Sequence, residues 1–215
     1  MKRLYFFLLP AIAFTVSGFG QDDRLAVPRH QFKVSIFDMM DPFSPAFMMG
    51  YEQPIAKRFA FYAEGGPVST FDGAWMMRKK MEGYKFRSEL KWYESISEAG
   101  GALIYLGVQA MHKKTLKNRQ DPFCVDDCTS IQDLEYGFEN KVTAGHIIFG
   151  AALPVAKHFA CDLGFFAGWR FAVRSRLDVP EGAIWVQREW DWWTVRPGRH
   201  SLPSLGASLR LGFGW

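Results

Sequence analysis

One histidine has neighbours that could give it a catalytic role. His146 lies in an alternating apolar run, and a neutral imidazole can act as a general base when a carboxylate orients it. Glu89 and Asp162 are carboxylates that could share its surroundings. A His-x-Ser pair is absent because Ile148 occupies that position, and the chain has no G-x-S-x-G, H-E-x-x-H or P-loop motif. A structural role for His146 within a network of charges is therefore favoured, and no catalytic residue is assigned.

Two cysteines are close enough in the sequence to react with each other. Cys124 and Cys128 are separated by three residues, and a local disulfide is the favoured interpretation in an oxidising compartment. The alternative is a metal site formed by both thiols with Asp121, Asp126 or Asp127. No histidine stands nearby and the spacing is not that of a standard zinc site, so neither a metal nor another cofactor is expected.

Aromatic and charged residues alternate in a third segment, near the end of the chain. Tryptophan and arginine dominate binding hot spots, which would suit a surface that contacts carbohydrate or protein. Tryptophan is also enriched where proteins cross the membrane interface, and this aromatic-girdle interpretation is favoured. The residues are Trp185, Trp190, Trp192 and Trp193, with Arg188, Glu189, Asp191 and Arg196 interleaved.

The predicted strands that position His146, the two cysteines and the tryptophans begin after an export signal. Lys2 and Arg3 precede an apolar run at 4–16, and small residues follow before Gln21, which predicts a signal peptide at 1–20. At thirteen residues the run is shorter than the ~20 that a helical membrane span needs. Without its two basic residues the remaining chain has 24 Lys and Arg against 22 Asp and Glu. These charges are dispersed, so binding to nucleic acid is not expected.

The remaining chain, residues 21–215, has the pattern of a single β-rich domain. The full sequence contains 48% hydrophobic residues, but no apolar stretch approaching eighteen residues follows the predicted signal peptide. A membrane β-barrel distributes its lipid-facing residues over short alternating segments in this way. Residues 205–215, for example, alternate strictly between apolar and small or polar side chains, which predicts a strand with one apolar face.

An internal repeat indicates the order of the strands. The segment from Pro54 to Phe61 recurs one hundred residues later from Pro154 to Cys161, and Gly50 recurs as Gly150. Each copy predicts a strand, a tight turn and a second strand, with the proline ending the first. Long connections at 69–83, 114–141 and 175–203 are expected at one end of the molecule. Eight strands are predicted at 32–38, 46–53, 59–68, 84–94, 102–113, 142–153, 159–174 and 204–215, and ten is the alternative because 184–195 is also strand-like.

Charged residues in these strands are expected to face the interior. Arg or Lys on the lipid side at mid-membrane would cost about 2 to 4 kcal/mol. An eight-stranded barrel is only wide enough to hold its own side chains, so these charges should pair and leave no wide pore. Cys161 is expected on the lipid side as a small apolar residue. The predicted interior network contains Lys33, Glu52, Glu64, Lys85, Arg87, Glu89, Lys91, His146, Asp162, Arg170, Arg174 and Arg210.

These features resemble the small eight-stranded outer-membrane barrels of the OmpA transmembrane-domain and OmpX type. The end of the last strand, with Leu211, Phe213 and Trp215, resembles the signal that the barrel-assembly machinery reads. The segment GYEQPIAKRFAFYAEGG is similar to a family of uncharacterised outer-membrane barrel proteins. The resemblance implies an all-β fold, a closed antiparallel transmembrane β-barrel in the outer membrane of a Gram-negative bacterium, surrounded by outer-membrane lipid.

The expected function is a structural role, or binding of an extracellular ligand through the long loops at 114–141 and 175–203. A monomer is expected. The alternative is a lipid A-modifying enzyme, an acyltransferase or a deacylase, because barrels of this size include such enzymes. Their chemistry depends on a histidine with a serine and a carboxylate.

Overall fold

The chain is almost entirely β-strand in the ranges that the computed structural model describes, which are residues 30–41, 44–69, 81–95, 102–125, 128–186 and 197–214. One four-residue helix interrupts the strands. The predicted all-β fold is confirmed. Within these ranges no helix combines the length and the apolar character needed to cross a membrane. The predicted signal peptide lies outside the described residues.

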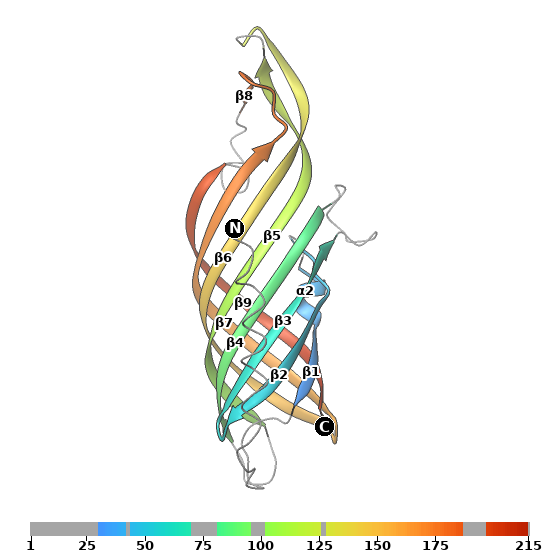
Figure 1. Cartoon of the computed structure of the whole chain (residues 1–215), viewed down its shortest axis with the longest axis vertical. Helices are drawn as coiled ribbons and strands as arrows, with labels where there is room; N and C mark the ends of the chain where they lie inside the picture. The colour runs from blue at the N-terminus through green and yellow to red at the C-terminus, as the bar shows by residue number, and fades with distance from the viewer. Residues whose placement is uncertain are drawn as a thin grey trace, which may run out of the picture.

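The strands form one antiparallel sheet arranged in a ring (Figure 1). Their order is β4-β3-β2-β1-β9-β7-β6-β5-β8, and β4 also pairs with β5. Nearly every strand therefore lies beside its neighbour in sequence, and the first strand pairs with the last. The elements are β1 (Gln31–Ser35), α2 (Ile36–Met39), β2 (Met48–Ala56), β3 (Phe59–Ser69), β4 (Met81–Ser95), β5 (Leu103–Val125), β6 (Ser130–Ala156), β7 (Phe159–Leu177), β8 (Ile184–Trp185) and β9 (Gly198–Gly214).

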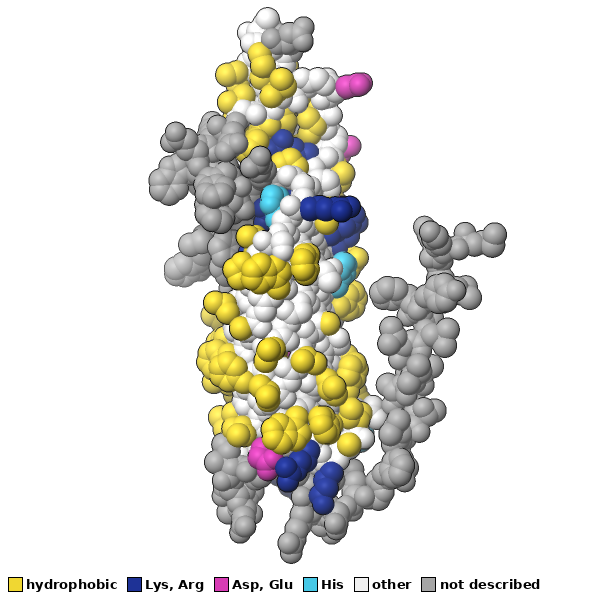
Figure 2. All heavy atoms as spheres, turned by 90° about the vertical axis from the view of Figure 1, so that its left-hand side faces the viewer, with side chains coloured by type: hydrophobic (Ala, Val, Ile, Leu, Met, Phe, Trp, Pro, Cys, Tyr) yellow, Lys and Arg dark blue, Asp and Glu magenta, His cyan; other side chains and the backbone are white. Residues whose placement is uncertain are grey.

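Buried and exposed residues alternate along the strands. On β4, Lys85, Arg87 and Glu89 are buried, whereas Phe86 and Leu90 are exposed. The buried set lies on the inner face, toward the middle of the ring, and the exposed set on the outer face. Figure 2 shows one side of the outer face, where hydrophobic side chains gather over the lower half of the wall. The molecule thus places charges inside and large apolar side chains outside.

The two copies of the internal repeat form equivalent hairpins. Hairpin β2–β3 has a register shift between Pro54 and Ala56, and hairpin β6–β7 has the same shift between Pro154 and Ala156. A β-bulge at the same place in both copies is consistent with the proline, which cannot donate a ladder hydrogen bond. The repeat therefore encodes the turn geometry as well as the two strands.

The first predicted strand, 32–38, is shorter than expected. Strand β1 ends at Ser35, and the next four residues form helix α2. The Ser35 hydroxyl donates to the Asp38 carboxylate at 2.6 Å. Continued alternation from buried Lys33 would have placed Asp38 on the outer face, whereas a helical turn of about 3.6 residues brings it inward. The predicted end of this strand was wrong, because the alternation of residues along one segment cannot predict a helical turn that places Asp38 in the interior.

The expected loop at 114–141 is instead a continuation of the β5–β6 hairpin. These strands contain 23 and 27 residues and pair continuously from Leu103–Ala152 to Val125–Ser130. Strand β4 begins opposite Lys117, so the hairpin from Lys117 to Phe138 projects beyond it; with β8 we call this part the extension. Its own apolar cluster explains why it is ordered, and consists of Phe123, Tyr136 and Phe138 with Val125, Leu134, Val179, Ala183 and Trp185 packed against them.

The expected loop at 175–203 is also shorter than predicted. Strand β7 continues to Leu177, and β9 begins at Gly198. The strand-like segment 184–195 contributes the two residues of β8, which pair with Phe123 and Cys124 of β5. Residues 187–196 lie outside the described ranges. In the described ranges eight strands thus follow the ring, from the five residues of β1 to the 27 of β6, and β8 is a short ninth strand on the extension.

Candidate functional site

The centre of the ring holds a square of alternating charges. The Lys33 ammonium lies 3.0 Å from Glu52 Oε2 and 2.6 Å from Asp162 Oδ2. The Lys91 ammonium lies 2.8 Å from each of the same two oxygens. The four side chains come from β1, β2, β4 and β7 and are almost fully buried. Each charge therefore has two partners of opposite sign, which offsets the cost of removing it from water.

Tyrosines satisfy the carboxylate oxygens that the lysines leave. Tyr93 donates its hydroxyl to Glu52 Oε1 at 2.8 Å, and Tyr105 donates to Asp162 Oδ1 at 2.6 Å. A Cβ at Gly150 or Gly164 would come within 2.5 Å of the Tyr105 hydroxyl, so both positions need the absence of a side chain.

The first repeat copy has the same arrangement. A Cβ at Gly50, which corresponds to Gly150, would lie 2.6 Å from the Tyr62 hydroxyl. That hydroxyl donates to Glu64 Oε2 at 2.8 Å. The repeated glycine therefore leaves room for one interior tyrosine beside each hairpin, Tyr62 of β3 in the first copy and Tyr105 of β5 in the second.

A second group of charges lies beside the square and centres on Arg210. Its guanidinium donates to both oxygens of Glu89, at 2.5 and 3.1 Å, and to Glu64 at 3.3 Å. Arg87 donates to the same Glu64 oxygen at 2.7 Å. A two-pronged arginine–carboxylate contact has fixed geometry, so this group links β9 rigidly to β3 and β4.

Asp38 is an interior acid that sequence reasoning missed. It accepts hydrogen bonds from Arg87 at 2.6 Å and from Lys85. Its contribution makes the network electrically balanced within the described residues. Five cations face five carboxylates, namely Lys33, Lys85, Arg87, Lys91 and Arg210 with Asp38, Glu52, Glu64, Glu89 and Asp162.

His146 lies next to this network in a chain of hydrogen bonds. Its Nδ1 is 2.8 Å from Gln109 Oε1, and the Gln109 amide donates to Glu89 at 2.7 Å. Because Gln109 Oε1 can only accept, Nδ1 of the neutral ring carries the proton and Nε2 is an acceptor. Ser204 Oγ lies 3.0 Å from that Nε2. No local pattern in the sequence predicts this pairing, since Ser204 is 58 positions away from His146.

Comparisons with known proteins identify no relative. No family model, curated protein or solved structure matches the chain. Its function therefore follows only from the arrangement of its own residues.

Two further residues of the predicted network lie farther along β7. Arg170 and Arg174 occupy the inner face of β7, but their register partners on β6 and β9 are uncharged. They lie beyond His146 and Ser204 in the direction of the extension. The level of these two side chains is therefore separate from that of the balanced network.

A half-buried cation of β7 lies among aromatic rings of the extension. The Arg176 guanidinium lies 4.3 Å from the Trp185 ring centroid and 5.8 Å from that of Tyr136. Asp121 accepts from Tyr136 and lies 3.2 Å from Arg119. Burial and the hydrogen bond to Asp121 raise the pKa of Tyr136 to about 12, so its hydroxyl stays protonated as a donor. Trp190, Trp192 and Trp193 lie outside the described residues.

Cys124 and Cys128 are joined as a disulfide at the tip of the extension. Both thiols are used, and Asp121 is occupied by neighbouring side chains, which does not support a metal site formed by these groups. Cys161 is a free, half-buried cysteine on β7. Leu211 and Phe213 of the expected assembly signal are exposed on β9, and Trp215 lies outside the described residues.

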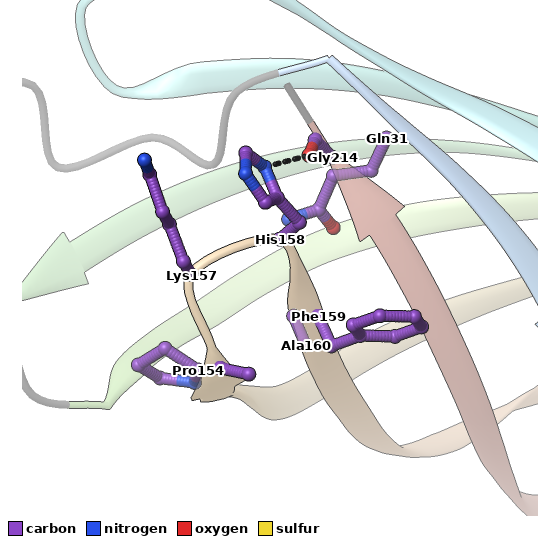
Figure 3. A pocket seen from close by; sticks show the side chains of 8 residues that line it. Gln31, Pro154, Lys157, His158, Phe159, Ala160 and Gly214 are labelled. Atoms are coloured by element: carbon purple, nitrogen blue, oxygen red, sulfur yellow. Dashed lines mark hydrogen bonds between the residues drawn. The ribbon is translucent and has the colours of Figure 1, made fainter.

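A small cavity of about 130 Å³ lies at the opposite end, beside the β6–β7 turn (Figure 3). His158 Nδ1 lies 3.1 Å from the Gly214 carbonyl oxygen, and the Gly214 amide donates to the His158 carbonyl at 2.8 Å. These contacts fasten the last strand to the repeat hairpin. Gln31, Pro154, Lys157 and Phe159 are among the residues that line it.

Proposed function

We propose that this protein is a closed β-barrel of eight membrane-spanning strands in the outer membrane of a Gram-negative bacterium. It has a structural role or binds a ligand at the cell surface. It works as a monomer without a cofactor, contacts outer-membrane lipid, and is inserted by the barrel-assembly machinery.

The observation that carries this proposal is the inverted distribution of polar and apolar side chains. The balanced ion network is buried inside the ring, and large apolar residues are exposed on every long strand, for example Phe32, Phe86, Val108, Ile147, Phe165 and Leu205. Soluble monomers rarely expose contiguous apolar patches larger than a few hundred Å². Lipid would cover this surface without cost.

The surface-binding role is assigned to the extension. It continues two strands beyond the rest of the ring and has its own apolar cluster, so it presents residues from a rigid support. The exposed Ile131 and Ile184 side chains lie on it. Rigid presentation lowers the entropy lost on binding.

A sealed interior gives the first test of this proposal. The full-length protein in planar bilayers is expected to give little steady conductance, because paired side chains fill the ring. The folded protein should also migrate differently on a gel when it has not been heated. Large stable currents, or identical mobility before and after heating, would contradict a sealed barrel.

An acyl-transfer enzyme is the second candidate function, and the Ser204–His146–Gln109 chain favours it. A serine hydroxyl within hydrogen-bond distance of an oriented neutral histidine is the arrangement of a nucleophile and its general base. The substrate class would be the acyl chains of a lipid such as lipid A. The alternative is a structural role, in which the same contacts only satisfy the hydrogen bonding of polar groups inside the ring.

Substitution of Ser204 distinguishes the two candidates. Ser204→Ala is expected to leave the lipid A acyl pattern of cells unchanged, since a structural hydroxyl transfers no acyl group. Ser208→Ala, on the same face of β9, is the matched control. The enzyme would be established instead if the wild-type protein altered the lipid A acyl pattern and Ser204→Ala, but not Ser208→Ala, abolished that alteration. Both variants must still show the gel shift.

A further inference from the structure

The outer face of the ring changes from apolar to cationic toward the extension. Val108, Ile147 and Ala167 pair side by side on β5, β6 and β7, and all three are exposed. Six residues farther along the strands, on the same face, Lys114 of β5 pairs with Lys141 of β6. Six residues correspond to about 20 Å along a strand. The apolar zone around Ile147 therefore ends within that distance.

The register of four strands brings three cations together at this level. Lys141 pairs with Lys114 on one side and with Val173 on the other, and Val173 pairs with Arg199 of β9. Neighbouring strands lie about 4.8 Å apart, so the backbones at Lys141 and Arg199 are about 10 Å apart. Lys141 and Arg199 are exposed, and Lys114 is half-buried. We call these three residues, Lys114, Lys141 and Arg199, the cationic row.

The acids beside the cationic row lie on its far side, away from the apolar zone. Glu139 is two residues beyond Lys141 and contacts both lysines, at 2.8 Å from Lys114 and 2.5 Å from Lys141. Glu82 of β4 is two residues beyond Tyr84, which pairs with Lys114. The adjoining residues on the apolar side include no acid, and they are Phe86, His112, Thr143, Phe171 and Ser201. A negative group approaching along the apolar zone would therefore meet the cations first.

Amphipathic aromatic side chains accompany this change of character. Tyr84 is exposed in line with the cationic row, and the exposed Trp169 donates its indole N–H to Ser201 Oγ at 2.5 Å. Tyrosine and tryptophan are enriched where the hydrocarbon of a membrane meets the headgroups. Figure 2 shows Lys, Arg and His side chains just above the hydrophobic side chains of the wall. If lipid covers the apolar zone, the cationic row lies at the level of the headgroups.

We propose that the cationic row binds the phosphate group of an anionic lipid whose acyl chains lie on the adjoining apolar zone. The guanidinium of Arg199 can bind phosphate through paired hydrogen bonds, and the lysines add point charges. The occupant is a lipid because cations and apolar surface are continuous, so one molecule with a phosphate and acyl chains fits both. This inference rests on the proposed membrane location and names the headgroup chemistry of the lipid bound there.

The test uses the full-length protein in phosphatidylcholine vesicles that contain brominated phosphatidic acid or brominated phosphatidylcholine. Bromine quenches tryptophan fluorescence on contact, and Trp169 lies on the outer face, four residues along β7 from Val173 in line with Lys141. The quenching curves give the association constant of phosphatidic acid relative to phosphatidylcholine. Phosphatidic acid is expected to be preferred, and Arg199→Gln to lower the preference about fivefold, the effect of one cation near anionic lipid. Raising the ionic strength should also weaken the preference.

Two variants control for charge. Arg199→Lys keeps the positive charge and should retain most of the preference. Lys157→Gln is the matched control, because it removes an exposed cation from the β6–β7 turn at the opposite end of the ring. Equal quenching by the two lipids, or equal effects of Arg199→Gln and Lys157→Gln, would overturn the phosphate site while still supporting lipid around the wall. Quenching by neither lipid would overturn the membrane location itself, and this inference with it.

Discussion

Replacing Asp162 with asparagine is expected to lower the free energy of unfolding by about 3 to 5 kcal/mol. The carboxylate contacts Lys33 at 2.6 Å, Lys91 at 2.8 Å and the Tyr105 hydroxyl at 2.6 Å, all in the buried interior. Without it, Lys33 would keep only Glu52, and Lys91 would keep Glu52 and the more distant Glu89 at 3.5 Å. Removing one partner of a buried pair is costly because the remaining charge stays out of water.

The measurement is equilibrium unfolding by urea in lipid vesicles, compared with Glu94→Gln as the control. Glu94 pairs with Arg58 at 2.8 Å, but both side chains are 40% or more exposed. An exposed pair contributes about 0 to 1 kcal/mol, so this variant should be nearly neutral. Combining Asp162→Leu with Lys91→Met removes one charge of each sign and should recover part of the loss. Similar small effects for Asp162→Asn and Glu94→Gln would mean that the square does not stabilise the ring.

Replacing Ile147 with arginine is expected to cost about 2 to 4 kcal/mol when the protein is folded in a lipid bilayer. Ile147 is 62% exposed on the outer face of β6, and its register partners are Val108 and Ala167. If lipid covers this face, as we propose, the guanidinium would enter the hydrocarbon. If water covers it, an exposed substitution should change the stability by no more than about 0.5 kcal/mol.

Thr143→Arg is the matched control for this experiment. Thr143 lies on the same face of β6, four residues from Ile147, between His112 of β5 and Phe171 of β7 and near Lys141. The polar neighbours indicate the edge of the apolar zone, where an arginine costs about 0 to 1 kcal/mol. The free energy of unfolding of both variants is measured by reversible folding into lipid vesicles. Equal costs at the two positions would contradict a membrane boundary between them.

The sequence alone determined the central part of each strand in the ring and its two faces. In a β-strand successive side chains point to opposite sides, so a two-residue period is visible without any knowledge of neighbouring strands. Lys85, Arg87 and Glu89 could therefore be placed on one face of a strand together. The repeat likewise predicted two equivalent hairpins, because proline and the turn beside it act locally.

The tertiary structure decided which of these side chains meet. Ser204 and His146 are joined, and Asp38 enters the network, because register and a helical turn bring together positions that no local pattern relates. The extension depends in the same way on contacts between Phe123 and Tyr136 across two strands and Trp185 of β8. Arg170 and Arg174 share the alternation of Asp162 but not its partners, because different residues of the surrounding strands lie at each level of the ring. Alternation determines the face of a residue, whereas only the register around the ring determines its neighbours.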